Sequence, residues 1–247
     1  MRRLLRPELD AALAGHLNRL QKSANEGADV ETLWKAERRK PSMIRIARVL
    51  GTVTGPRERC MYCEDSRGTD IEHFWPRQYR HRVFQWLNML WVCTGCNRCK
   101  GNRFPCDASG APLLIDPTAE DPWDYLFYDP QTDEITARWD RATGEENPKG
   151  RNTVALLATL RHQAITESRR RTRRSLQRTI RVFLHRIKVE EDDRPTCIEA
   201  FLEEISDFRD HGLAQWFFLR EGREEPPFTD LRRELPDVWA RITKLLA

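Results

Sequence analysis

Apolar residues recur at helical spacing near both ends of the chain. In the N-terminal part, four leucines predict a helix over residues 7–24 that begins at Pro7: Leu9, Leu13, Leu17 and Leu20. Asp29 is expected to cap a second helix that reaches about Arg39, and Pro41 to begin a third. The pattern returns after residue 152, where helices are expected over residues 153–164, 166–188, 195–209, 213–220 and 230–246.

Between these helical stretches the pattern changes to short segments typical of strands. Residues 69–74 and 86–92 are expected to form two strands, and Thr94 to cap the helix that follows them. Residues 126–128 and 134–139 are typical of a β-hairpin. The sequence therefore predicts a mostly helical α+β fold in four parts: N-terminal helices over residues 1–55, a compact core over 56–110, a loop and hairpin segment over 111–150, and C-terminal helices over 151–247.

The composition is that of a soluble protein whose charge is unevenly distributed. Charged residues make up 32% of the chain, the mean hydropathy is −0.70, and the net charge is +4. Residues 1–60 and 151–190 are basic, whereas residues 111–150 and 191–247 are acidic. A basic face could therefore meet a polyanion although the whole chain is only weakly basic. Because no apolar run is typical of a signal peptide or a membrane span, we expect a cytoplasmic location without membrane contact.

Four of the seven cysteines form two Cys-x-x-Cys pairs, Cys60 with Cys63 and Cys93 with Cys96. Four thiolates at this spacing suit one tetrahedral structural Zn²⁺ ion, and in a chain of this length they favour metal binding over disulfides. The other three cysteines are interpreted as free thiols, and an exchange of the first of them for one of the four ligands stays open: Cys99, Cys106 and Cys197.

The segment between the two pairs contains residues suited to hydrolysis. Glu72 and His73 place a carboxylate beside an imidazole, and a neutral imidazole can take a proton from water near pH 7. In a regular strand these two side chains would point to opposite faces, so both reach one site only if the strand ends or bends there. Asp70 lies on the Glu72 side by alternation. It is interpreted as a turn cap, and a role as an additional metal ligand stays open.

This part of the chain resembles the HNH endonuclease family, whose core is the ββα-metal fold. The family pattern has an acidic residue, His, two mostly apolar residues and Pro, then an Asn, and then Cys-x-x-Cys-Asn-x-x-Lys-Gly. The corresponding residues here are Glu72-His73-Phe74-Trp75-Pro76, then Asn88, then Cys93-Thr94-Gly95-Cys96-Asn97-Arg98-Cys99-Lys100-Gly101. The resemblance covers residues 60–104 and implies a small zinc-stapled ββα-metal core flanked by helical regions.

The resemblance implies a role for each matched polar residue. His73 corresponds to the general base, and Asn88 to the residue that orients the histidine and its loop. Glu72 and Asn97 correspond to ligands of a catalytic divalent metal, which would neutralise the scissile phosphate and the leaving 3′ oxygen. The last family position is often His. With an amide oxygen there instead, the site is expected to prefer Mg²⁺ or Mn²⁺ to Zn²⁺ or Ni²⁺.

Basic residues around the motif are candidates for phosphate contacts, because nucleic-acid backbones are bound mainly by Lys and Arg. They are Arg77, Arg80, Arg82, Arg98, Lys100 and Arg103. A second basic face recurs at helical spacing over residues 169–188, opposite an apolar stripe. It suits a solvated face of an amphipathic helix, a DNA track or a site for an acidic protein partner: Arg170, Arg174, Arg178 and Arg181.

Two functions are consistent with these residues. The favoured one is a metal-dependent DNA endonuclease or nickase, and the alternative is a non-catalytic zinc-stapled module that binds nucleic acid or protein. A wider similarity links the chain to the HNH nuclease subunits of Septu-type anti-phage systems and of some retrons. It extends over residues 1–7, Leu113-Leu114-Ile115-Asp116-Pro117, Glu120-Asp121-Pro122, Tyr125-Leu126-Phe127, and residues 133–139 and 153–160. It implies an ABC-like ATPase partner and a role in defence against invading DNA.

Overall fold

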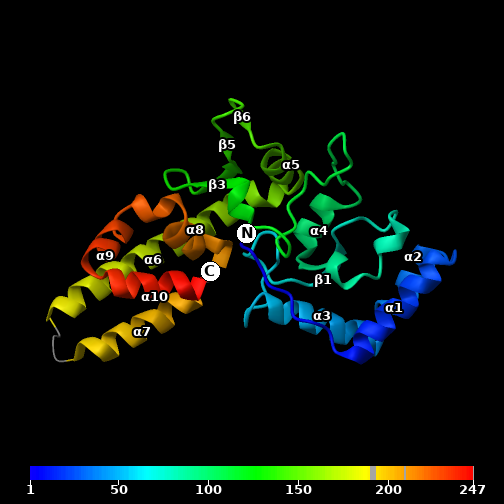
Figure 1. Cartoon of the computed structure of the whole chain (residues 1–247), viewed down its shortest axis with the longest axis horizontal. Coiled ribbons are helices and arrows are strands. Elements are labelled where there is room, and N and C mark those ends of the chain that lie inside the picture. The colour runs from blue at the N-terminus through cyan, green and yellow to red at the C-terminus, as the bar shows by residue number, and fades with distance from the viewer. Residues whose placement is uncertain (190–192, 209, 247) are drawn as a thin grey trace. The chain divides into compact units, whose positions relative to one another are not determined.

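The computed structural model describes residues 1–189, 193–208 and 210–246 (Figure 1). Contacts between residues divide the chain into two compact units. Unit 1 comprises Met1–Phe127 and Ile135–His162, and unit 2 comprises Tyr128–Glu134 and Gln163–Ala247. The fold is α+β and mostly helical, as the sequence predicts. The strands of the described residues form small two-stranded sheets.

Three helices begin unit 1: α1 (Ala11–Asn25), α2 (Val30–Glu37) and α3 (Pro41–Val53). The predicted starts of α2 and α3 are confirmed, since the Asp29 carboxylate accepts a hydrogen bond from the Thr32 amide at 2.8 Å and Pro41 opens α3. The predicted start at Pro7 is wrong. Asp10 caps α1 instead, because its carboxylate satisfies the otherwise unpaired Leu13 amide at 2.9 Å, a contact that stabilises a helix by about 1 kcal/mol.

The motif segment forms a hairpin followed by a helix. Strand β1 (Asp70–His73) pairs antiparallel with β2 (Met89–Val92), with Asp70 opposite Val92 and His73 opposite Met89. The second strand is shorter than predicted because residues 86–88 form a 3-10 turn. Helix α4 (Thr94–Lys100) follows, and its cap is Cys93 and not Thr94: the Cys93 sulfur accepts from the Cys96 amide at 3.4 Å. Helix α3 packs against β2.

The remainder of the middle segment contains short strands and one helix. Strands β3 (Leu126–Asp129) and β4 (Glu134–Ala137) confirm the predicted hairpin. Strands β5 (Trp139–Asp140) and β6 (Glu145–Glu146) form a second, exposed hairpin, and α5 (Pro148–Leu156) follows it. Gly150 of α5 approaches the backbone closely, since an added Cβ would lie 2.1 Å from the Tyr125 carbonyl oxygen.

Unit 2 is built from helices α6 (Gln163–Val189), α7 (Arg194–Asp207), α8 (Leu213–Leu219), α9 (Phe228–Glu234) and α10 (Pro236–Leu246). The single helix expected over residues 230–246 is two helices, because Pro236 lacks the amide that would continue the first. Stacked aromatic rings pack in the core, and the ring centroids of Phe183 and Phe201 are 3.8 Å apart. Among the described residues, no helix combines the length and the apolar character that crossing a membrane requires.

A buried carboxylate ties the β3–β4 turn to α6 within unit 2. The Asp133 side chain is fully buried and accepts hydrogen bonds from Arg170 at 2.9 Å, from Arg173 at 2.7 Å and from the Tyr128 hydroxyl. Burial alone would raise the pKa of Asp133, but the hydrogen bonds from Arg173, Tyr128 and Arg170 outweigh it and lower that pKa. Arg170, predicted as part of a free basic face, is therefore engaged in an ion pair.

Candidate metal centre and active site

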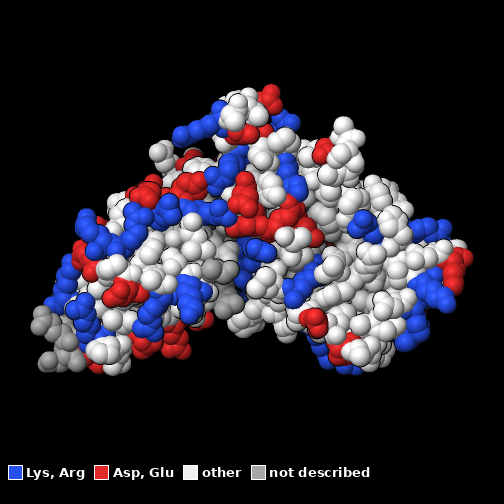
Figure 2. All heavy atoms as spheres, in the orientation of Figure 1, with Lys and Arg blue, Asp and Glu red and all other residues white. Residues whose placement is uncertain are grey.

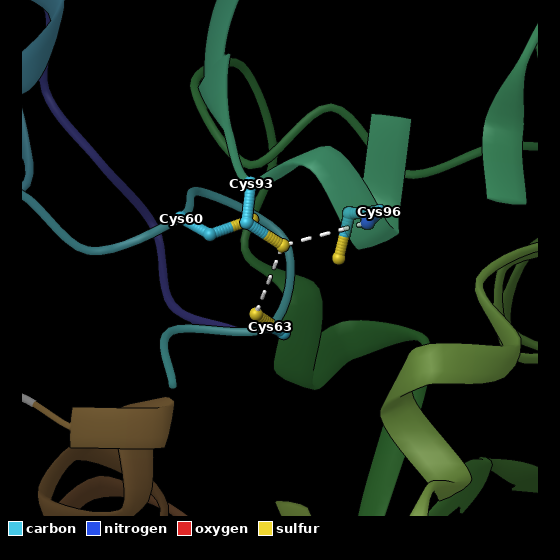
Figure 3. Close-up of side chains that lie close together, drawn as sticks. All are labelled: Cys60, Cys63, Cys93 and Cys96. Atoms are coloured by element: carbon cyan, nitrogen blue, oxygen red, sulfur yellow. Dashed lines mark hydrogen bonds between the residues drawn. The ribbon is translucent and has the colours of Figure 1, made fainter. Parts of the chain in front are cut away.

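The four predicted cysteine ligands converge on one point in unit 1 (Figure 3). Their sulfur atoms all lie within 4.8 Å of one another, and all four residues are buried. The Cys63 and Cys93 sulfurs are 3.9 Å apart. A tetrahedral zinc site with Zn–S bonds of about 2.3 Å requires sulfur–sulfur distances of about 3.8 Å. The cluster could therefore hold a metal ion such as zinc, and Cys99 lies outside it.

Local structure explains this convergence. Cys60 and Cys63 lie in a turn closed by the Cys60 amide on the Ser66 carbonyl at 2.8 Å, whereas Cys93 and Cys96 lie at the N-terminus of α4. Hydrogen bonds among the thiols lower the pKa of Cys93, and the bond with Cys60 is the largest cause. The bond with Cys60 is also the largest cause that lowers the pKa of Cys63, to about 7. Burial raises the pKa of Cys60. Both Cys-x-x-Cys pairs are therefore held in place by backbone hydrogen bonds, those of a turn for the first pair and those of a helix start for the second.

Three residues predicted to perform the chemistry line one cavity. This cavity of about 150 Å³ lies where β1 ends and is bordered by Glu72, His73 and Asn97, together with Pro76, Arg77, Gly101 and Asn102. His73 is the last residue of β1, so the strict alternation of a strand no longer separates its side chain from that of Glu72. The condition set by the sequence, a strand that ends at this point, is met.

His73 is enclosed without a polar partner. Its side chain is 2% exposed, and the edge of the Trp34 ring from α2 packs against it at 4.5 Å between ring centroids. The Val83 backbone lies close to the imidazole and favours its charged form, which raises the pKa of His73. Neither ring nitrogen, however, has a hydrogen-bond partner among the described residues. Burial, reinforced by the positive charges of Arg77 and Lys100, lowers the pKa of His73 to about 3. The imidazole is therefore neutral at pH 7.

Asn88 organises the loop that follows His73. Its side-chain oxygen accepts from the Trp75 amide at 2.7 Å, and its side-chain nitrogen donates to the carbonyls of Trp75 at 3.0 Å and Arg82 at 2.9 Å. Three hydrogen bonds from one buried amide fix the two ends of this loop. This position is consistent with the orienting role that the resemblance implies for Asn88.

Lys100 is not placed to contact a phosphate. It is fully buried, and its ammonium donates to the Glu72 carboxylate at 2.6 Å and to the His73 carbonyl at 2.7 Å. The prediction of a phosphate contact is therefore corrected: Lys100 lies under the cavity, because α4 packs its C-terminal turn onto β1. Burial raises the pKa of Glu72 and lowers the pKa of Lys100, even though each charge favours the other.

Asp70 lies beside Asn97. Its carboxylate accepts from the Asn97 side-chain nitrogen at 3.3 Å and from the Thr94 hydroxyl at 3.2 Å. A second carboxylate therefore stands next to the amide, without a lysine on it. Trp34 had no motif to mark it in the sequence, because it reaches His73 only when α2 folds against the end of β1.

The other predicted phosphate contacts differ in their surroundings. Arg77 donates to Glu31 at 2.8 and 3.2 Å and lines the cavity. Arg80 donates to the Ala24 carbonyl in the last turn of α1 and to the Ala28 carbonyl in the loop after it, so its guanidinium stabilises the end of this helix. The Arg82 guanidinium lies 4.5 Å from the centre of the Trp75 ring.

Two further cations of this region, and the basic face of unit 2, point to solvent. Arg98 is exposed and has no ion pair with a described residue, and the exposed Arg103 donates to the Cys99 carbonyl. On α6, three exposed arginines form no ion pair with a described residue: Arg174, Arg178 and Arg181.

No model of a known protein family, no curated protein and no solved structure matches this chain. The function is therefore inferred from the residues and their geometry alone.

Proposed function

We propose that the chain is a metal-dependent endonuclease or nickase of the HNH type that hydrolyses DNA phosphodiester bonds. The observation that supports this function best is one cavity, of about 150 Å³, bordered by an imidazole, a carboxylate and an amide beside a four-cysteine cluster. His73 is the general base, Asn97 and Glu72 are the metal-binding side chains, and Asn88 orients the loop. The four cysteines bind a structural Zn²⁺, which requires the reducing conditions of a cytoplasm.

His73 is in the protonation state that a base requires. Its ring is neutral at pH 7, so one of its two nitrogens carries no proton and can accept one from water, and neither nitrogen forms a hydrogen bond with a described residue. A bound phosphate would place negative charge near Arg77 and Lys100, whose positive charges lower the pKa of His73. Its arrival would raise that pKa toward neutrality and make the ring a stronger base. General base catalysis of this kind contributes about 10²- to 10⁴-fold in rate.

The oxygen donors fit a hard divalent cation. The Asn97 amide oxygen with the carboxylates of Glu72 and Asp70 is a donor set typical of Mg²⁺ or Mn²⁺ sites. When bound, the cation supplies positive charge to the scissile phosphate and the leaving oxygen. For Glu72 to serve as a ligand, its carboxylate must share or leave the Lys100 ammonium.

That ion pair favours the alternative function, a zinc-stapled module that binds nucleic acid or protein without turnover. A lysine already neutralises the carboxylate that catalysis would use. In either case the proposed partner is an ABC-like ATPase of an anti-phage system.

The decisive experiment is a plasmid-nicking assay with Mg²⁺ or Mn²⁺, with and without the protein encoded by the neighbouring gene. We expect His73→Ala to abolish nicking and to keep DNA binding. The matched control is His81→Ala, which removes an exposed imidazole from the loop between the same two strands. Nicking that survives in His73→Ala refutes the assignment of the base. Activity with Ni²⁺ or Zn²⁺ but not with Mg²⁺ or Mn²⁺ refutes the assignment of the ligands.

A further inference from the structure

A larger groove adjoins the His73 cavity in unit 1. Its volume is about 660 Å³, and it shares Glu72, Arg77 and Asn97 with that cavity. One wall consists of β1 and Trp91, and the other consists of α2 and α3. The groove therefore leads from the surface of the N-terminal helices to the residues proposed to cut a phosphodiester. Arg77 stands at the junction, held by Glu31 from α2.

Cations concentrate on the helical wall of this groove. Lys35 lies in the last turn of α2, and Arg38 and Arg39 follow directly after it. All three are exposed, and none of their side chains donates a hydrogen bond to, or forms an ion pair with, a described residue. Figure 2 shows lysine and arginine side chains gathered over the part of unit 1 that α1 and α2 form.

Helix electrostatics account for only part of this arrangement. Cations near a helix C-terminus are stabilised by the helix dipole, which suits Lys35 in the last turn of α2. Lys40, next to these residues, is used differently, because it pairs with the buried Glu37 at 2.5 Å and does not line the groove. Lys35, Arg38 and Arg39 thus remain available to an anionic ligand at the place where one would approach His73.

Two of the three carboxylates in the groove are already neutralised by other cations. Glu31 is bound to Arg77 and Glu72 to Lys100, whereas Asp70 accepts from the uncharged donors Asn97 and Thr94 and keeps its negative charge. The rest of the wall offers apolar surface suited to a sugar or a base, including Ile44, which is 44% exposed. A phosphate backbone has the alternation of anionic and apolar groups that such a wall accommodates.

We propose that this groove binds the phosphate backbone of the DNA strand that is cut, with Lys35, Arg38 and Arg39 as its phosphate contacts. The inference rests on the proposed nuclease function for the direction of the strand, which runs over the α2–α3 corner to His73. It also moves the main phosphate contacts away from the loop between β1 and β2, where Arg80 is engaged by backbone carbonyls.

The test measures DNA binding in a His73→Ala background, so that no cleavage intervenes. Fluorescence anisotropy follows the binding of a labelled duplex and of its single strand across a series of salt concentrations. The groove variant is Lys35→Ala/Arg38→Ala/Arg39→Ala. The control variant is Arg3→Ala/Arg19→Ala/Arg48→Ala, which removes the same charge from exposed arginines of unit 1 outside the groove. Circular dichroism confirms that both variants fold.

Each lost phosphate contact reduces the slope of log K against log salt by about 0.9 for a duplex and about 0.7 for a single strand. We expect the groove variant to lose about 2.7 in duplex slope, from three such contacts, and the control variant to keep the wild-type slope. Equal slopes for the two variants would overturn the inference, as would a protein that binds neither probe. Loss of slope in the groove variant of a chain that never nicks plasmid would support the groove and refute only the nuclease.

Discussion

Lys100→Met tests the buried ion pair between Lys100 and Glu72 at the proposed active site. The Lys100 ammonium is fully buried and lies 2.6 Å from the Glu72 carboxylate and 2.7 Å from the His73 carbonyl. Methionine keeps most of the side-chain volume but leaves the Glu72 side chain, which is only 9% exposed, without its counter-charge. Removing one member of a buried ion pair costs about 3 to 5 kcal/mol. We expect a loss of that size, which is large beside the 5 to 15 kcal/mol that typically separates folded from unfolded chains.

The double variant Glu72→Met/Lys100→Met tests whether the ion pair itself contributes to the free energy of unfolding or only compensates for the burial of its two charges. Burial raises the pKa of Glu72 and lowers the pKa of Lys100, so desolvation exceeds the mutual attraction for both groups. Replacing both charges removes that penalty, and such replacements are often neutral or stabilising. We therefore expect the double variant to recover most of the stability that the single variant loses.

Urea unfolding followed by circular dichroism measures both variants, and the pH dependence supplies a second readout. Because the folded-state pKa of Glu72 is raised, its neutral form is stabilising below the unfolded value of about 4.3, and this contribution is lost as pH rises through the folded pKa. The deficit of Lys100→Met is thus expected to grow from acid toward neutral pH. A deficit below about 1 kcal/mol, or a double variant as unstable as the single one, would refute this account of the pair.

Two further predictions concern the cysteine cluster and the β3–β4 turn. Cys93→Ser, or treatment with a strong chelator, is expected to remove one zinc per chain, which elemental analysis measures, and to unfold the hairpin and α4. The reason is that structural zinc contributes about 10 to 16 kcal/mol to folding in zinc-finger peptides. The control variant Cys99→Ser is expected to change neither the zinc content nor the fold. Asp133→Ala is expected to lower the free energy of unfolding by about 2 to 3 kcal/mol in urea titrations, because Arg170 and Arg173 lose their charged acceptor. The lowered pKa of Asp133 contributes stability above its unfolded pKa of about 3.9, so the difference from wild type should vanish as pH falls through the folded pKa.

The sequence predicted the elements better than their surroundings. Local rules sufficed where one residue decides the outcome, as with the Asp29 cap and the start of α3 at Pro41. They failed at the first helix, where Pro7 suits a first helical position but the helix begins after Asp10, whose carboxylate pairs with the Leu13 amide. Pro236 was overlooked inside an otherwise continuous helical pattern, although its missing amide breaks the helix there.

At the candidate site, too, local sequence patterns predicted some features, and only the packing of distant segments reveals the others. Cysteine spacing predicted which four thiols meet, because two Cys-x-x-Cys turns flanking a short hairpin have few other ways to pack. Lys100 was predicted to contact a phosphate because basic side chains bind nucleic-acid backbones, and only the packing of α4 on β1 reveals its carboxylate partner. Lys35 and Trp34 belong to a helix far away in sequence, so no local pattern could place them beside β1.

The chain passes between its two units at three points, after Phe127, after Glu134 and after His162. As a result, neither unit corresponds to one continuous stretch of gene. A fragment that begins at Gln163 would contain Arg170 and Arg173 but not the carboxylate that receives them. Recombination at a single junction therefore cannot exchange either unit whole, because a segment of unit 2 is inserted between two segments of unit 1.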